Sequence, residues 1–114
     1  MKRLLWISLA FVAAGASAQG RPCAEPEYAF VRDATKPEIR SEYCTLVRRA
    51  ESNEHDREST QITIKQKRDL HLDTATDRER ELNELKAANS CRGAAATLAV
   101  ALERRFKSKT PSCS

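Results

Sequence analysis

The chain has 114 residues, of which 20 are Lys or Arg and 16 are Asp or Glu. A formal net charge of +4 is too small to argue for a protein that binds nucleic acid or an anionic membrane. With three glycines and no G-x-S-x-G motif, the sequence also lacks a phosphate-binding loop and a hydrolase nucleophile turn. We therefore expect one small domain that is not an enzyme and that uses no cofactor.

Residues 1–18 have the features of a signal peptide. Two basic residues precede an apolar run at residues 4–12, and the segment ends in the small residues Ala16-Ser17-Ala18, a pattern that signal peptidase recognises. The apolar run is shorter than the roughly 20 residues of a membrane-spanning helix. The sequence thus predicts export to the periplasm or beyond, and a mature chain that begins at Gln19 with no membrane span.

Removal of the signal peptide leaves a domain with few core residues. The mature chain keeps 96 of the 114 residues and a net charge of +2, and Leu, Ile, Val and Phe supply roughly a sixth of it. That share is below the ~20% at which disorder becomes a concern in highly charged chains. Because the net charge is low, we expect a folded domain whose thin core depends on covalent staples.

Four cysteines fall in the mature chain: Cys23, Cys44, Cys91 and Cys113. An even number in a small exported domain predicts two disulfides. The pairs 44–91 and 23–113 share a midpoint near residue 68, which favours nested bridges in a chain that folds back on itself. The alternative pairs 23 with 44 and 91 with 113. No C-x-x-C is present, so a zinc site or a thioredoxin-like redox site is not expected.

The mature chain is expected to begin with an irregular, Pro-containing leader at residues 19–36. Tyr28, Phe30 and Val31 in this leader are predicted to cover the helices, with a ligand-facing aromatic cluster as the alternative. A helical domain, residues 37–107, starts at Pro37, where the missing N–H costs nothing. Its first buried stripe is predicted at helical spacing: Ile39, Tyr43, Leu46, Val47 and Ala50. Residues 53–59 are all polar and indicate a solvated helix end or a turn.

Residues 60–90 allow two interpretations. Ile62, Ile64, Leu70 and Leu72 alternate with polar residues, which is compatible with a β-hairpin, although its turn would lack Gly, Asn and Pro. The favoured alternative is one long or interrupted helix, which leaves Ile62 and Leu70 outside. Its buried face collects Ile64, His71, Leu72, Ala75, Leu82 and Leu85. Thr76 and Glu79 could form a capping box for a helix starting near residue 77, and residues 77–88 are rich in helix formers on either view.

The last part of the domain is predicted to be a separate helix at residues 94–107. Asn89, Ser90 and Gly93 indicate a helix end and a turn around Cys91. The buried stripe of the following helix comprises Ala95, Leu98, Ala99, Leu102 and Phe106. Residues 108–114 form a tail held by Cys113. The predicted fold class is all-α: a small helical hairpin or three-helix domain stapled by two disulfides.

Candidate chemistry is sparse. His55 and His71 have carboxylate neighbours, but neither has a second ligand at i+4, so exposed histidines are favoured over a metal site. A basic cluster near the C-terminus could bind an anionic polymer or an acidic protein: Arg104, Arg105, Lys107 and Lys109. The simpler interpretation is that these cations stabilise the negative end of a helix macrodipole.

The functional prediction that follows is a non-catalytic binder of a protein or cell-envelope component. The alternative is a periplasmic stress chaperone or metal-responsive helical protein that uses His55 and His71. The cysteine layout loosely resembles that of exported lysozyme-inhibitor-type helical proteins. Residues 85–90 (LKAANS) stand where that group has a tryptophan and a Tyr-Arg-Asp run, so no family is assigned from the sequence.

Overall fold

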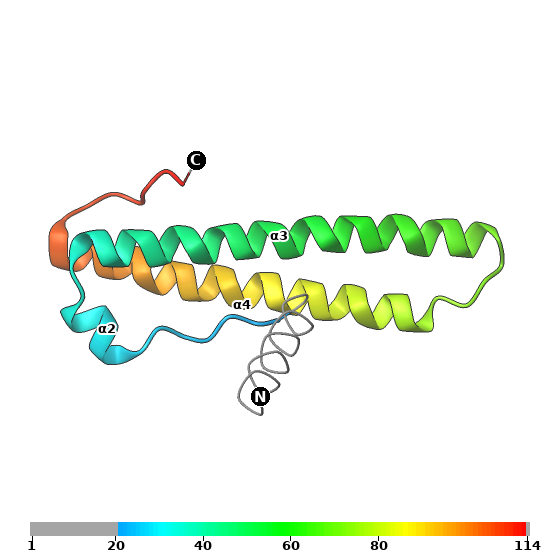
Figure 1. The fold of residues 1–114 in the computed structure, drawn as a ribbon, viewed down its shortest axis with the longest axis horizontal. Helices are drawn as coiled ribbons and strands as arrows, with labels where there is room; N and C mark the ends of the chain where they lie inside the picture. Colours follow the sequence, from blue (N-terminus) through cyan, green and yellow to red (C-terminus); the bar gives the residue numbers. More distant parts are fainter. Residues whose placement is uncertain (1–20, 114) are drawn as a thin grey trace, which may run out of the picture.

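A computed structural model describes residues 21–113, so the predicted signal peptide lies outside the described residues. Three helices are present in this range: α2 (Tyr28–Asp33), α3 (Lys36–Asp69) and α4 (Ala75–Phe106). The long helices α3 and α4 run antiparallel as a hairpin, and α2 lies at the end opposite their connecting turn (Figure 1). The predicted all-α fold class is confirmed.

α3 begins at a capping box. The Thr35 hydroxyl accepts a hydrogen bond from the Glu38 backbone N–H (3.3 Å), and the Glu38 carboxylate accepts one from the Thr35 N–H (2.8 Å). The Thr35 backbone N–H, followed by its hydroxyl, lowers the pKa of Glu38 below its usual value. Pro37 lies in the first turn, where it displaces no intrahelical hydrogen bond. The predicted start at Pro37 is therefore correct to within one residue.

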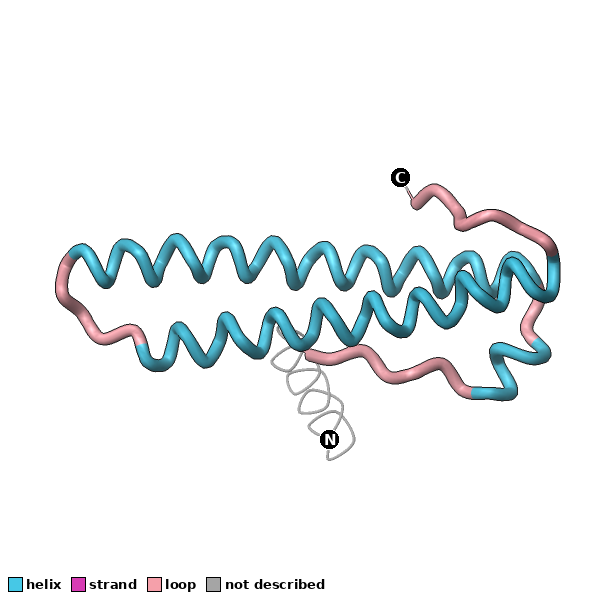
Figure 2. The backbone as a smooth tube through the Cα atoms, turned by 180° about the vertical axis from the view of Figure 1, so that it is seen from behind, coloured by secondary structure: helices cyan, strands magenta, loops and turns pink. Residues whose placement is uncertain are grey.

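The expected break at residues 53–59 is wrong, because α3 continues through this polar stretch to Asp69. The β-hairpin interpretation is also wrong: the chain reverses in a five-residue connection, residues 70–74, between two helices (Figure 2). His71 adopts a left-handed backbone conformation there (φ 59°). Leu72 N–H donates to the Lys67 carbonyl at 2.8 Å and thereby satisfies one of the last carbonyls of α3.

α4 is longer than expected and starts differently. It begins at Ala75 with Thr74 as an N-cap that makes no side-chain capping bond, so the capping box proposed for Thr76 does not start the helix. It also runs unbroken past Asn89 and Gly93, which corrects the predicted helix end at that point. The physical reason is tertiary packing: fully buried Cys91 and its alanine neighbours lie against α3, which outweighs the weak helix propensity of Asn and Gly.

The two long helices meet along a seam with coiled-coil spacing. Buried or half-buried positions on each helix recur at alternating intervals of three and four residues, as in a heptad repeat. On α3 they are Ile39, Tyr43, Leu46, Ala50, Asn53, Arg57, Thr60, Ile64 and Lys67. On α4 they are Asp77, Glu81, Glu84, Ala88, Cys91, Ala95, Leu98 and Leu102.

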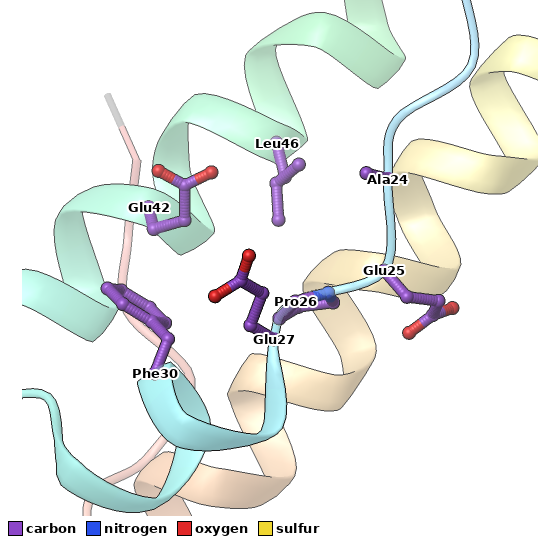
Figure 3. Close-up of a pocket in the computed structure, with 7 residues that line it drawn as sticks. All are labelled: Ala24, Glu25, Pro26, Glu27, Phe30, Glu42 and Leu46. Carbon is purple, nitrogen blue, oxygen red and sulfur yellow. The ribbon is translucent and has the colours of Figure 1, made fainter.

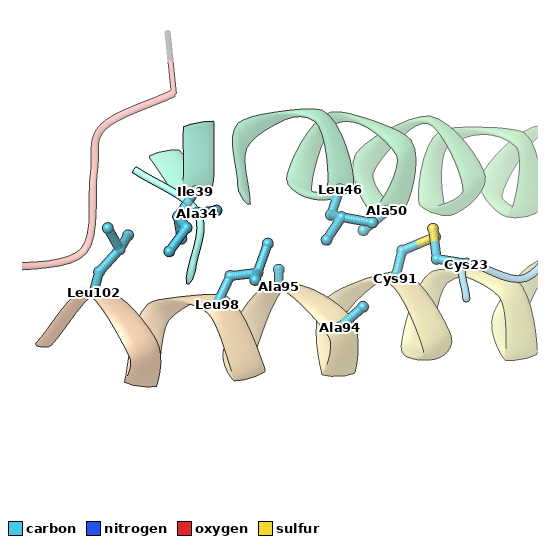
Figure 4. Packing of buried hydrophobic residues seen from close by; sticks show 10 residues of the cluster. All are labelled: Cys23, Ala34, Ile39, Leu46, Ala50, Cys91, Ala94, Ala95, Leu98 and Leu102. Atoms are coloured by element: carbon cyan, nitrogen blue, oxygen red, sulfur yellow. A yellow bond between two sulfur atoms is a disulfide. The ribbon is translucent and has the colours of Figure 1, made fainter. Parts of the chain in front are cut away.

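The apolar core occupies only one end of this seam. We call residues 36–50 and 91–106 the proximal half, and residues 51–90 the distal half. In the proximal half Ile39, Leu98 and Leu102 are fully buried. Figure 4 shows them in one cluster with Leu46 and with alanines of both helices. Small alanines let the two helix backbones approach closely. The predicted burial of Ala95, Leu98 and Leu102 is confirmed, whereas Ala99 and Phe106 are half-buried.

All four cysteines are oxidised, but the favoured nested pairing is wrong. The bridges are Cys23–Cys91 and Cys44–Cys113, so they cross along the sequence. Two ion pairs between α3 and α4 show which of their residues lie opposite one another. Lys67 pairs with Asp77, and Glu54 pairs with Arg92. A residue of α3 therefore lies opposite the residue of α4 whose number brings the sum of the two to about 144–146.

In this register Cys44 lies level with about residue 100. It is therefore some nine residues, roughly 13 Å at 1.5 Å per residue, from the level of Cys91, too far for a disulfide. The chain folds back at about residue 72, in the α3–α4 connection, whereas the nested pairing assumed residue 68.

Each bridge instead fastens one end of the chain to the hairpin. Cys23 anchors the leader to α4, and the Ser90 hydroxyl donates to the Cys23 carbonyl at 2.7 Å. At the other end Lys107 turns the chain in a left-handed conformation (φ 53°). The tail then runs back along α3 to Cys44 (Figure 1). The leader, expected to be irregular throughout, contains the short helix α2.

The crossed pairing predicts how much the disulfides contribute to the free energy of unfolding. Each bridge closes a loop of 68 or 69 residues, so replacing Cys44 and Cys113 together by Ala should lower the free energy of unfolding by about 2–5 kcal/mol. Urea denaturation followed by circular dichroism measures this change. Peptide mapping without reduction should link the peptides that carry Cys23 and Cys91, and a link between Cys44 and Cys91 would contradict the structure.

Candidate functional site

The predicted basic cluster is present at the end of α4, but part of it holds the fold together. Arg104, Arg105, Lys107 and Lys109 are all exposed. The Arg105 guanidinium donates to the Val31 carbonyl of α2 at 2.8 Å and lies over the Phe106 ring, 4.6 Å from its centroid. Arg105 therefore attaches α2 to α4, and the remaining cations suit the helix C-terminus electrostatically.

The two histidines are not brought together. His55 is exposed in the middle of α3, and His71 is exposed in the turn, about 24 Å further along at 1.5 Å per residue. Within residues 21–113 no group of three or more His, Cys, Asp and Glu side chains is placed to hold a metal ion. His55 and His71 are therefore too far apart to bind one metal ion together.

A hollow lies between the leader and α3, at the proximal end of the hairpin. Its volume is about 290 Å³, near the lower limit of small-molecule sites. Phe30, which the sequence placed in a lid over the helices, forms one wall, and Leu46 of α3 forms another (Figure 3). The other lining residues are Ala24, Glu25, Pro26, Glu27 and Glu42.

The seam of the distal half is polar. Asn53, Thr60, Asp77 and Glu84 are buried, each with at most 7% of its surface exposed. Lys67 Nζ donates to an Asp77 carboxylate oxygen at 2.7 Å, and the Thr60 hydroxyl donates to the Asp56 carbonyl at 3.0 Å. These contacts satisfy some of the buried polar groups. Removing a charged group from water costs free energy, and its ion pair must offset that cost.

Two buried charged groups in this seam lack hydrogen-bond partners among the described residues. They are Arg57 Nε and Glu84 Oε1. The register set by the Lys67–Asp77 pair places Arg57 and Thr60 close to the level of Glu84. An unsatisfied buried polar group costs about 1–3 kcal/mol, and more when it is charged. The distal seam therefore contributes much less to stability than the proximal one.

Four large apolar side chains are exposed on the distal half, among charged and polar residues. Ile62 is 59% exposed, Leu82 49%, and the turn residues Leu70 and Leu72 are 69% and 55% exposed. These are four of the six large apolar side chains that are exposed in the described part of the chain. The favoured helical interpretation left Ile62 and Leu70 outside, as observed, but was wrong to place Leu72 and Leu82 on the buried face. The heptad spacing of the polar seam is the signal that could have identified them as exposed.

An exposed ion pair lies close to the junction of the two halves. Arg92 donates through Nε and Nη2 to the two Glu54 carboxylate oxygens at 2.8 and 2.6 Å. This hydrogen-bonded contact lowers the pKa of Glu54 and raises that of Arg92. Because both side chains are nearly half exposed, the pair fixes register more than it adds stability.

Comparisons with known proteins do not assign a relative: no family model, no curated protein and no solved structure matches the chain. Among the helices described, none has a stretch long and apolar enough to cross a membrane.

The polar seam predicts coupling between Lys67 and Asp77, whose side chains form an ion pair at 2.7 Å. Changing Lys67→Leu alone should destabilise the protein by about 1–3 kcal/mol, because Asp77 would remain buried without its countercharge. Combining it with Asp77→Leu should recover much of that loss, since no unpaired buried charge is then left. Urea unfolding of both single variants and the double variant tests this coupling. Additive losses would contradict it.

Proposed function

We propose that this is an exported, non-catalytic binding protein whose distal half binds a protein partner through its exposed apolar side chains. The observation that carries the proposal is that this half buries charged and polar residues in its seam while four large apolar side chains are exposed on its surface: Ile62, Leu70, Leu72 and Leu82. The two disulfides fit an oxidising compartment outside the cytoplasm.

The positions of the disulfides and of the apolar core support different roles for the two halves of the hairpin. Both chain ends are fastened along the hairpin, and the apolar core lies in its proximal half. The distal half projects beyond this core as two helices and a turn (Figure 1). A projecting segment with exposed large apolar side chains suits recognition of a partner that covers them.

The exposed apolar side chains supply part of the free energy that specific binding needs. Burying a half-exposed Leu or Ile side chain is worth about 1 kcal/mol, and four such residues contribute about 4 kcal/mol before any polar contact is counted. A partner with a matching apolar patch could therefore reach micromolar affinity if hydrogen bonds or ion pairs were added at the rim.

The experiment is a pull-down from cell-envelope extract with the oxidised mature chain as bait. A specific partner should be retained, and the double variant Ile62→Ser/Leu82→Ser should weaken its binding about tenfold or more. Val100→Ser is the matched control, because Val100 is 46% exposed on α4 but lies in the proximal half. Failure to retain any partner, or equal losses in the control, would contradict the proposal.

A chaperone function is a second candidate, because exposed apolar side chains on a projecting segment could also hold unfolded chains. It predicts that the protein slows the aggregation of several unrelated reduced proteins, and that Ile62→Ser/Leu82→Ser abolishes the effect. A binder of one partner would leave those aggregation rates unchanged. Light scattering of the aggregating test proteins distinguishes the two functions.

A further inference from the structure

The two disulfides differ in their accessibility to solvent. Cys91 is fully buried and Cys23 has 7% of its surface exposed, so the bridge between them belongs to the core cluster. Cys44 and Cys113 are only half-buried. A thiol in solution must reach a sulfur atom to attack a disulfide. It can reach the Cys44–Cys113 bridge in the folded protein, whereas the Cys23–Cys91 bridge reacts only when the core opens.

The leader has contacts with the long helices besides its disulfide. The Ser90 hydroxyl of α4 donates to the Cys23 carbonyl at 2.7 Å, and the Arg49 guanidinium of α3 donates to the Arg21 carbonyl at 3.5 Å. The helix α2, which follows the leader segment, is itself hydrogen-bonded to α4. The attachment of the leader therefore does not depend on one bond.

The tail lacks a second attachment of this kind. The Ser108 N–H donates to the Leu102 carbonyl at the end of α4 (3.2 Å), and the other hydrogen bonds of the tail join its own residues. In the described part of the chain, no hydrogen bond or ion pair links residues 109–113 to α3. Three of these five residues are exposed. The Cys44–Cys113 bridge is therefore the bond that holds the tail along α3 (Figure 1).

The tail also covers part of α4. Residues 107–110 form one wall of a hollow of about 530 Å³, and Ala99, Val100 and Glu103 of α4 form the other. Release of the tail would remove its wall and leave this part of α4 as an open surface. The redox state of one disulfide thus determines whether the end of α4 is covered.

We propose that the tail, residues 107–113, is a redox-controlled strap that a dithiol releases by reducing Cys44–Cys113 while Cys23–Cys91 stays oxidised. A thiolate of the dithiol attacks one sulfur of the bridge, which breaks the S–S bond and forms a mixed disulfide. The second sulfur of the dithiol then attacks the mixed disulfide and closes a disulfide within the dithiol. Two electrons pass to the bridge, and the two protons of the dithiol end on the Sγ atoms of Cys44 and Cys113. Reoxidation restores the strap.

The test reduces the oxidised mature chain with increasing dithiothreitol under native conditions. Free thiols are trapped with iodoacetamide and identified by mass spectrometry of peptides. We expect a form alkylated only at Cys44 and Cys113 to accumulate, because their bridge should react about tenfold or more faster than Cys23–Cys91. The matched control is the same reaction in urea, where the unfolded chain exposes both bridges and the two rates should agree within about threefold.

NMR relaxation of the backbone amides identifies the released tail. In the form alkylated at Cys44 and Cys113, residues 109–113 should have order parameters below about 0.6, while α3 and α4 keep values of about 0.85. The variant Cys44→Ala/Cys113→Ala should show the same mobile tail without reductant. The variant Cys23→Ala/Cys91→Ala is its matched control and should keep the tail ordered.

Three outcomes would overturn the proposal. They are equal rates of reduction of the two bridges in the folded protein, earlier reduction of Cys23–Cys91, and a tail that stays ordered after Cys44–Cys113 is broken. The result is independent of the pull-down, because the reduction requires no partner and the pull-down uses the oxidised chain.

Discussion

Two helices of 34 and 32 residues share one long seam, and the apolar residues available to fill it extend along only part of its length. Ile39, Leu46, Leu98 and Leu102 occupy the proximal half and bury nearly all of their surface. In the distal half most of the equivalent positions are polar or charged, and only Ile64 and Ala88 are apolar. Since hydrophobic burial is the main favourable term in folding, the free energy that holds the hairpin together is concentrated at one end.

The disulfides reinforce this asymmetry. Each fastens a chain terminus along the outside of the hairpin, the leader to α4 and the tail to α3. Their stabilisation acts on the loops they close, both of which contain the α3–α4 turn, but neither bridge lies beyond Cys91 toward that turn. The distal helices are therefore held by register-setting ion pairs such as Lys67–Asp77 and by Ile64, which is buried in the seam. Regions with few buried apolar contacts open locally at lower cost than the rest of a protein, which suits a segment that adapts to a partner.

The sequence was sufficient for the fold class, the oxidised cysteines, the start of α3 near Pro37 and most of the proximal core. It was not sufficient for the disulfide pairing, because pairing depends on register, and register depends on where the chain turns. The turn at residues 70–74 contains no glycine or proline, so nothing in the local sequence marks it strongly. Asn53 was interpreted as solvated because polar residues are mostly exposed, whereas here it is buried in the seam.

The candidate sites, like the disulfide pairing, depend on contacts that the sequence alone does not show. The basic residues near Arg105 and the two histidines were visible as residue types, but the structure uses Arg105 to hold α2 and leaves the histidines far apart. The hollow between the leader and α3 joins residues on either side of α2, and only the path of the leader brings them together (Figure 3). A sequence pattern could not reveal it, because its lining residues belong to no motif.

The central claim is that the two halves of one continuous hairpin differ in stability because their seams differ in polarity. Native-state hydrogen exchange of the oxidised chain, followed by NMR, tests it most directly. The account predicts that seam amides at residues 57–67 and 78–86 exchange about a hundredfold or more faster, relative to their intrinsic rates, than those at residues 43–50 and 92–102. Equal protection of both halves would show that the hairpin opens as a single unit and would contradict the account.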